Sequence, residues 1–379
     1  MGSPSSSFVQ IAYGMAQWAR RDGMFTTGQE QPSNFFQSHE ELDTAWNSWA
    51  RLEEKKRAAM GLYIHDAQLA SLFHHDPNLR HGAIQLSAAA SNELFSAPSA
   101  AQWADLMRTH PPQSYLQEHI HFSQPQDLQQ HPLPIEIGCA HSRLSCYVTL
   151  HGIEAAVAES GRTYHVLPNQ QIFDKFRDAL TCWYHAYGKT SSPNSPDIFC
   201  LMILWHKIFM SLLVDFDSLE RAIGRDGSVQ AAFAQEYVST WASSIEAKRC
   251  IMHASLINDH LAAMRVDAEP AIHVPGCTFS AAIAWYCYTK FGVADNHAPD
   301  CNENLDFPET KALGIRSGQQ LFELCGATRP KPTVMGAGPL RGLTDMLNKL
   351  GHWDTSKRFA GILGLLLHGD TEGHLLDYS

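Results

Sequence analysis

The stretch Trp46–His81, WNSWARLEEKKRAAMGLYIHDAQLASLFHHDPNLRH, decides the fold class of this chain. It contains no proline before Pro77, and Gly61 is the weakest helix former in its interior. When residues are placed about 100° apart around a helix axis, apolar side chains gather on one face. They are Trp46, Trp49, Met60, Ile64 and Ala67. The sequence therefore predicts one long helix, running to Pro77, that packs an apolar face against the rest of the protein.

The same face carries an acid and a base. Glu53 and Arg57 lie four residues apart, a spacing at which side chains on a helix meet. A charge on an apolar face is tolerated only when it is paired and hydrogen-bonded. We therefore predict a buried ion pair between Glu53 and Arg57. The short basic run 55–57 as a whole is expected to be a solvated helix face and no nuclear import patch.

Helical periodicity extends over most of the chain. Further helices are predicted at residues 8–21, 83–95, 98–109, 139–158, 171–187, 197–222, 228–265, 277–291 and 339–368. Two stretches rich in proline and polar residues, 110–134 and 294–338, are expected to be loops or disorder. Alternating strand patterns and hairpin dipeptides are lacking. The predicted fold class is therefore all-α, one multi-helix domain over residues 1–379 with two irregular inserts.

Composition indicates a globular protein without a dedicated nucleic-acid surface. The 379 residues are 44% hydrophobic and 18% charged, as in chains that build a substantial core. The formal net charge of −11 argues against a DNA-reading surface, which is basic. The most apolar run, Phe199–Val214, is interrupted by His206 and Lys207 and is shorter than the roughly 20 residues that a membrane span needs. We expect a buried core helix there and no membrane partner.

Cysteine and histidine usage indicates neither disulfides nor a zinc site. The nine cysteines are scattered without a CxxC pair, and a cysteine inside an apolar stretch behaves as a small hydrophobe. The N-terminus shows no secretory signal, so a reducing compartment is expected. The close histidine pairs lack the His-Glu-x-x-His pattern; they are His74/His75, His119/His121 and His253/His260. Of these, His253 borders the apolar stripe of its helix and is expected to be a satisfied core histidine.

An acidic cluster offers the main alternative to a non-enzymatic protein. Asp215, Asp217 and Glu220 follow the apolar run, and all-α prenyl-pyrophosphate enzymes hold magnesium on Asp-rich helix segments, because hard cations take carboxylate oxygens. Such enzymes need a second metal motif, and Asn258-Asp259 lacks the hydroxyl and carboxylate residues that would complete it. A solvated helix end is the expected structure. A magnesium-dependent terpene-type enzyme using Asp215 and Asp217 stays open as the alternative.

A glycine cluster near the C-terminus does not form a nucleotide loop. Gly336, Gly338 and Gly342 (GAGPLRG) approach the dinucleotide pattern, but the last spacing is one residue too long and no βαβ setting is predicted. A helix lead-in with Pro339 near the first turn is expected. No nucleophile elbow, phosphate loop or kinase signature occurs. The sequence therefore predicts no catalytic, cofactor-binding or metal-binding residue.

Several stretches share their order with one known family. Tryptophans, a Glu, a Lys/Arg run and an apolar stretch with Asp66 follow one another in Trp46–His81, and NELFSAPSAAQW (92–103) comes next. Together with QWARRDGMF (17–25) they resemble the fungal-specific transcription factor regulatory domain, or middle homology region. LWHKIFMSLLVDFDSLERAIGRDG (204–227) and WASSIEAKRCIMHASLINDH (241–260) are similar to the subset usually attached to a two-Cys two-His zinc finger.

The resemblance implies a regulator and not an enzyme. It implies an all-α domain in the nucleus that controls an attached DNA-binding region through homo- or heterodimerisation or a small-molecule effector, frequently in secondary-metabolite gene clusters. The chain departs from the pattern because it contains no zinc finger and no basic DNA-reading helix. We expect either a truncated gene product or a protein that reaches DNA only indirectly, through a DNA-binding partner.

Overall fold

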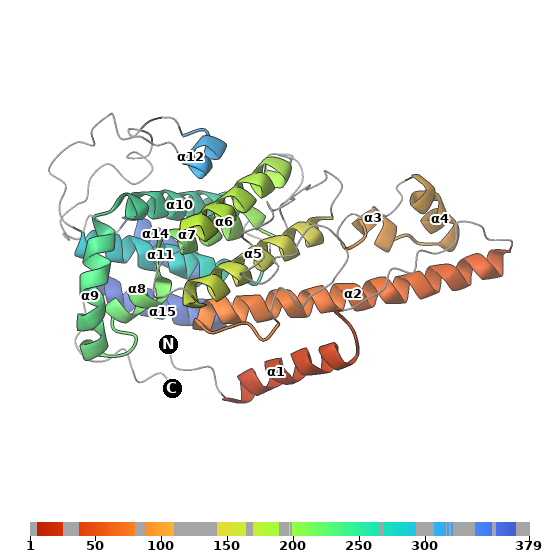
Figure 1. The fold of residues 1–379 in the computed structure, drawn as a ribbon, viewed down its shortest axis with the longest axis horizontal. Coiled ribbons are helices and arrows are strands. Elements are labelled where there is room, and N and C mark those ends of the chain that lie inside the picture. The colour runs from red at the N-terminus through yellow and green to blue at the C-terminus, as the bar shows by residue number, and fades with distance from the viewer. Residues whose placement is uncertain are drawn as a thin grey trace. The chain divides into compact units, whose positions relative to one another are not determined.

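All regular elements that the structure describes are helices. The structure is a computed structural model that describes residues 6–25, 38–79, 88–109, 142–163, 170–188, 197, 199–264, 269–292, 307–315, 317, 320, 338–350 and 354–368. Within these ranges no strand occurs (Figure 1). The prediction of an all-α fold is confirmed.

The chain divides into two compact units, Pro4–Thr190 and Ser191–Ser379. We call them the N-terminal and the C-terminal unit and describe each by itself. The prediction of one domain over the whole chain stays a prediction. The first predicted insert, residues 110–134, lies outside the described residues.

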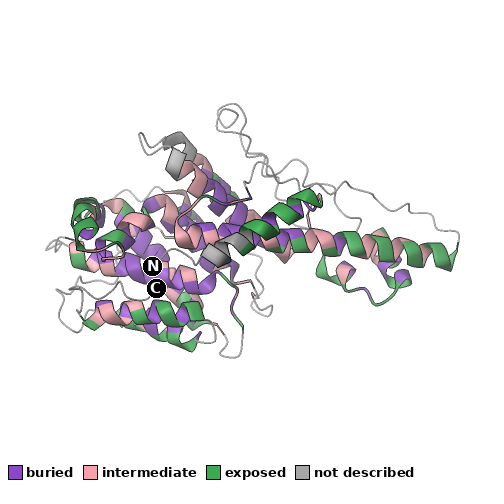
Figure 2. Cartoon of the chain, turned by 90° about the horizontal axis from the view of Figure 1, so that it is seen from below, coloured by how far each residue is buried: buried purple, intermediate pink, exposed green. Residues whose placement is uncertain are grey.

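Helix α2 (His39–Phe73) is the longest element of the N-terminal unit. It begins where the Ser38 hydroxyl accepts the backbone N–H of Glu41, which satisfies one of the free donors of the first turn. It ends at Phe73, before the predicted Pro77, because His74 adopts a left-handed backbone conformation with φ 52°. Exposed and buried residues alternate around α2 (Figure 2), as its amphipathic sequence requires.

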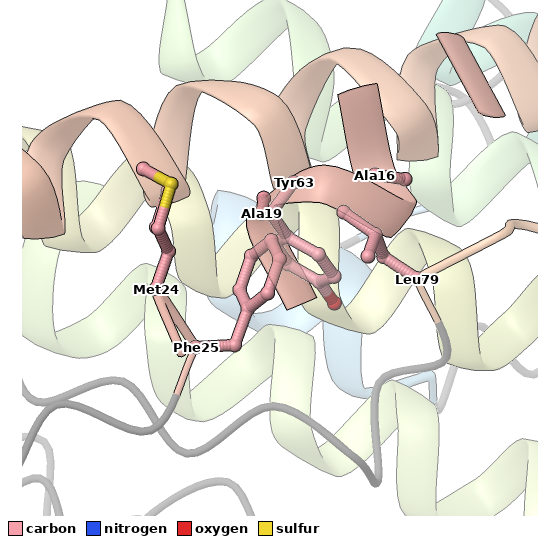
Figure 3. Packing of buried hydrophobic residues seen from close by; sticks show 7 residues of the cluster. Ala16, Ala19, Met24, Phe25, Tyr63 and Leu79 are labelled. Atoms are coloured by element: carbon pink, nitrogen blue, oxygen red, sulfur yellow. The ribbon is translucent and has the colours of Figure 1, made fainter. Parts of the chain in front are cut away.

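The other helices of this unit pack on α2. Helix α1 (Ser6–Arg21) contacts α2, and its Ala16 and Ala19 pack with Met24, Phe25 and Tyr63 in one buried cluster that Leu79 completes (Figure 3). Helices α3 (Asn92–Phe95) and α4 (Ala100–Thr109) lie near the start of α2, and α5 (Arg143–Thr163) packs along it. Helix α6 (Gln170–Trp183) contacts α5 and is followed by the π-helical turn η4 (Tyr184–Gly188).

Helix α11 (Val274–Phe291) is the centre of the C-terminal unit. Its middle residues 281–284 are fully buried, because the helix is apolar around most of its circumference and so needs neighbours on every side. Those neighbours are α7 (Leu201–Leu213), α8 (Phe216–Ala222), α9 (Ser228–Ala242), α10 (Ile245–Ala262), α14 (Gly338–Lys349) and α15 (Asp354–His368). The apolar run at 199–214 thus forms a buried core helix, as predicted, and no described helix is long and apolar enough to cross a membrane.

Local capping breaks two predicted helices. The predicted helix 197–222 is interrupted between α7 and α8, where the Asp215 carboxylate accepts the N–H of Asp217. The predicted helix 228–265 is interrupted between α9 and α10, where the Ser244 hydroxyl accepts the N–H of Ala247. Ser and Asp side chains compete with the helical backbone for its hydrogen bonds, so they start new helices. The predicted segment 339–368 likewise comprises two helices, α14 and α15, and α12 (Pro308–Leu313) lies inside the predicted irregular stretch 294–338.

Candidate functional site

The Glu53 carboxylate is the centre of a polar cluster on α2. Its Oε1 accepts hydrogen bonds from Nε of Arg57 at 3.1 Å and from the backbone N–H of Ala90 at 2.8 Å. Its Oε2 lies 2.6 Å from Nζ of Lys56. Because the Glu53 side chain is only 2% exposed, these partners replace the water that a carboxylate would otherwise bind. The predicted ion pair between Glu53 and Arg57 is confirmed.

The two cations of the cluster, Lys56 and Arg57, also donate hydrogen bonds to the backbone of residues 88–90. Nη2 of Arg57 donates to the carbonyl of Ala90 at 2.8 Å, and Nζ of Lys56 donates to the carbonyl of Ala88 at 2.8 Å. The guanidinium of Arg57 lies 4.0 Å from the ring centroid of Phe95, a cation–π geometry. We call Glu53, Lys56 and Arg57 with the segment 88–95 the α2 clamp.

The clamp explains why part of the predicted helix 83–95 is wrong. Residues 88–91 are not helical, because several of their backbone groups bond to side chains of other elements: the Ala88 carbonyl and both groups of Ala90 to α2, and the Ala89 N–H to Ser145 of α5. The short helix α3 starts only where the Ser91 hydroxyl accepts the N–H of Leu94. Beyond it, Trp103 of α4 packs against Trp49 of α2, with ring centroids 5.6 Å apart.

The expectation of a solvated basic run is wrong for two of its three residues. Lys55 is the outward one and pairs with Asp22 at 3.0 Å. The side chains of Lys56 and Arg57 are only 15% and 17% exposed. Sequence reasoning missed the burial of Lys56. Beside Glu53, its acceptor is the backbone carbonyl of Ala88, 32 residues away, and no residue type in a sequence indicates a carbonyl acceptor.

The acidic cluster of the C-terminal unit is paired with arginines. Oδ1 of Asp217 lies 2.6 Å from Nη2 of Arg225, and Oε2 of Glu220 lies 3.1 Å from its Nη1. Arg221 adds a second contact to Asp217 at 2.8 Å. Burial alone would lower the pKa of Arg225, but hydrogen bonds to Asp226 and Asp217 and the charges of Asp217 and Glu220 favour the protonated guanidinium, so the pKa is raised.

Asp215 has a structural role beside that network. Its Oδ1 accepts the N–H of Asp217, and its Oδ2 accepts the Ser218 hydroxyl at 2.5 Å, so it caps α8. With these oxygens engaged in capping and in arginine pairs, the described part of the acidic cluster offers no ready carboxylate set for magnesium. Among the described residues no group of three or more His, Cys, Asp or Glu side chains is placed to hold a metal ion.

A second buried ion pair joins α10 to α12. Nε of Arg249 donates to Oε1 of Glu309 at 2.6 Å, and both side chains are almost completely buried. The guanidinium lies 3.8 Å from the ring centroid of Phe307. The α2 clamp has the same arrangement. In both sites an arginine pairs with a buried Glu and lies over the ring of a Phe at one end of a short helix.

Three histidines meet between α7 and α10. His206 and His253 are buried, and their Nδ1 atoms lie 2.9 Å apart. The ring of His260 follows, with its centroid 5.4 Å from that of His206. Nδ1 of His253 thus has a hydrogen-bond partner in the core, as expected, whereas its Nε2 is buried without one. The pairing of His253 with His206 was not predicted, because the two are 47 residues apart.

The remaining sequence candidates show no ligand site in the described residues. Of the histidine pairs, His74 and His75 close the end of α2, and His119 and His121 lie outside the described residues. The described glycines Gly338 and Gly342 belong to α14, which starts with Pro339 in its first turn, as expected; Gly336 lies outside. The six described cysteines are free thiols.

A small apolar hollow lies between α1 and α2. Its volume is about 50 Å³, and its walls include Ile11, Met15, Leu62 and Leu69. Cavities that take drug-sized ligands measure about 300 Å³ or more, so this hollow has room for water molecules and not for a small-molecule effector.

No protein-family model matches the chain, and no significant match is found among curated proteins or among solved structures. The α2 clamp is the best-defined polar site that the structure describes. Its side chains bind protein backbone, so the site orders chain segments and presents no reactive group.

Proposed function

We propose that this chain is the all-α regulatory part of a fungal transcription factor and has no catalytic activity of its own. The observation that carries the proposal is the α2 clamp. The residues on which the resemblance rests, around Glu53 and Arg57 and again at 92–103, are in direct contact through the clamp and the Trp49–Trp103 pair. If the residues shared with a family are packing and ion-pair residues, they are expected to contact one another in the folded protein in this way.

The C-terminal unit adds a second observation of the same kind. The two stretches similar to the zinc-finger-associated subset, 204–227 and 241–260, contain most of α7 and most of α10, whose contact is the most extensive between any two described elements. Both stretches of the resemblance in this unit thus meet in one helix contact, as a family pattern made of packing residues is expected to do.

In this proposal the protein acts in the nucleus on protein partners, as a homo- or heterodimer, and meets DNA only indirectly. The reading of DNA belongs to a zinc finger outside this sequence or to a partner. The net charge of −11 agrees with this division, because a direct DNA surface is basic. Control of a secondary-metabolite gene cluster and response to a small-molecule effector are parts of the proposal that rest on the resemblance alone.

A reporter experiment tests the proposal. The full chain is fused to a heterologous DNA-binding domain, and transcription of a reporter bearing its sites is measured in a fungal cell. We expect reporter output to differ several-fold from that of the DNA-binding domain alone, and the difference to be lost with Glu53→Ala but kept with Glu54→Ala, which changes an exposed neighbour. A nuclear, well-expressed fusion that leaves transcription unchanged contradicts the proposal.

The alternative, a magnesium-dependent terpene-type enzyme, gains no support from a specific contact. Asp215 caps α8, and Asp217 pairs with Arg221 and Arg225.

A further inference from the structure

The histidine cluster of the C-terminal unit runs from its surface into its core. His260, near the end of α10, is partly exposed, His206 of α7 is 1% exposed, and His253 of α10 is 0% exposed. The imidazole of His206 is the middle member, since it contacts both others. Protons from solvent therefore have a short path of neighbouring rings to the most extensive helix contact of this unit.

The contact between His206 and His253 depends on how many hydrogens the pair carries. Their Nδ1 atoms lie 2.9 Å apart, so one must donate an N–H and the other must accept with its lone pair. A proton added to the accepting Nδ1 places two N–H groups opposite each other and removes the bond. A proton added elsewhere on the pair leaves a positive charge in an apolar site.

The surroundings of the pair favour neutral rings. The His253 ring stacks on Phe209, with centroids 5.0 Å apart and an angle of 12° between planes, and lies edge-on to Trp205. The charged group that acts on His253 is the guanidinium of Arg249, one turn earlier on α10, and it repels a second positive charge. No carboxylate acts on His253 in the same way among its identified electrostatic neighbours.

The outer histidine, His260, has negatively charged neighbours, in contrast to His253. Asp197 before α7 and Asp259 on α10 act on His260 and favour its protonation. Of the helices packed against α7 and α10, α11 is preceded by buried His273, whose Nε2 lies 3.2 Å from the Cys200 carbonyl. Of the other helices in contact with α10, α12 carries the buried Glu309, which pairs with Arg249. The ionisable residues of α9 and α14 are exposed: Glu236 and Tyr237 on α9, and Arg341, Asp345 and Lys349 on α14.

The pKa values of all three rings are shifted in one direction. Burial lowers the pKa of His253 to about 3, with a further contribution from Arg249. Burial also lowers the pKa of His206 well below its usual value, and the neighbouring His253 and His260 add to this. For His260, burial lowers the pKa and the two aspartates oppose the shift. The folded cluster is therefore neutral where free histidines are already protonated.

We propose that His206, His253 and His260 form an acid-sensitive latch, which keeps α7 packed on α10 while the imidazoles are neutral and releases the two helices when they take up protons. The driving force is the difference in proton affinity between the packed and the open state. The open state exposes the rings to water and binds the protons that the packed state excludes.

The sign and size of the effect follow from proton linkage. A histidine with a lowered folded pKa contributes stability that is complete above its unfolded pKa, near 6.5, and is lost as the pH falls toward the folded pKa. Between pH 6.5 and 5.5 each such group raises the unfolding equilibrium constant about 5.5-fold, so His206 and His253 together raise it about thirtyfold.

The test compares pH profiles of the full chain and a variant. The unfolding equilibrium constant is measured by urea denaturation from pH 7.5 to 5.0 for wild type and His253→Asn. The Asn amide keeps a hydrogen-bonding atom near the position of Nδ1 but takes up no proton. We expect the ratio of wild-type to variant constants to rise about fivefold between pH 6.5 and 5.5. The control His368→Asn, which removes an exposed histidine from α15, should keep the wild-type profile.

A local readout identifies the helices concerned. In hydrogen–deuterium exchange of wild type, corrected for the intrinsic pH dependence of exchange, protection of α7 and α10 should fall between pH 7.5 and 5.5 more than protection of α2. If His253→Asn does not fold, His260→Gln at the outer end of the cluster should give a smaller change of the same sign. Parallel pH profiles of wild type and variant, or undiminished protection of α7 and α10 at pH 5.5, would overturn the proposal.

Discussion

The carboxylate of Glu53 lies 3.1 Å from Nε of Arg57 on the buried side of α2, and the same oxygen accepts the backbone N–H of Ala90. One acid thus joins two turns of a helix to a segment 37 residues away. Removing a member of such a site is costly, because its partners stay behind in a place that water reaches poorly.

Glu53→Ala should lower the free energy of unfolding by about 3 kcal/mol. The substitution leaves the Ala90 N–H without its acceptor and places Lys56 and Arg57 side by side without their shared counter-charge. Urea denaturation measures the loss. Glu54→Ala, an exposed neighbour, should change stability by less than about 0.5 kcal/mol. Equal stability of both variants would refute the clamp as an energetic site.

Arg57→Lys should cost about 1 kcal/mol although it keeps the charge. A lysine cannot contact Glu53, the Ala90 carbonyl and the Phe95 ring at once, as the planar guanidinium does. The same loss should appear as faster amide exchange in residues 92–109, where α3 and α4 lie. The exposed Arg51→Lys is the matched control, and identical exchange in both variants would contradict the role of the fork geometry.

Magnesium should not stabilise the protein through Asp217. Its carboxylate already contacts Arg221 and Arg225 at 2.8 and 2.6 Å, so a cation would have to displace two guanidinium groups. We expect thermal unfolding in millimolar magnesium chloride to match that in sodium chloride of equal ionic strength. A rise of several degrees in Tm that disappears with Asp217→Asn would revive the enzyme alternative.

Replacing one partner of the buried Arg249–Glu309 pair should lower the free energy of unfolding more than replacing both. Glu309→Ala leaves the guanidinium buried without its counter-charge, at about 3–5 kcal/mol, whereas apolar residues at both positions are expected to cost much less. A double-mutant cycle with Arg249→Met and Glu309→Leu measures the difference in urea. Strictly additive losses would show that the two side chains do not act as a pair.

Thiol reactivity should follow exposure. Cys182 is exposed, whereas Cys250 and Cys287 are fully buried, and burial also raises the pKa of the Cys287 thiol. Since the thiolate is the reactive form, peptide mapping after brief treatment with N-ethylmaleimide at pH 7.5 should find label on Cys182 and not on Cys287. Equal labelling of both in native protein would contradict the packing of α11 against α8.

Sequence patterning sufficed for features that depend on residues close together in the chain. The apolar face of α2, the pairing of Glu53 with Arg57 and the buried run at 199–214 all follow from helical spacing. The same spacing could not predict the helix interruptions at Asp215 and Ser244, because each depends on one side chain that caps the next helix.

What the sequence by itself determined is the helical class, most helix positions and which faces are apolar, because these depend on contacts between residues three or four apart. What only the tertiary structure decided is where those faces meet. Lys56 binds a carbonyl 32 residues away, and His206 meets His253 across 47 residues. Packing determines such partners, because a buried charge or imidazole hydrogen-bonds to the polar group that the folded chain brings within about 3 Å.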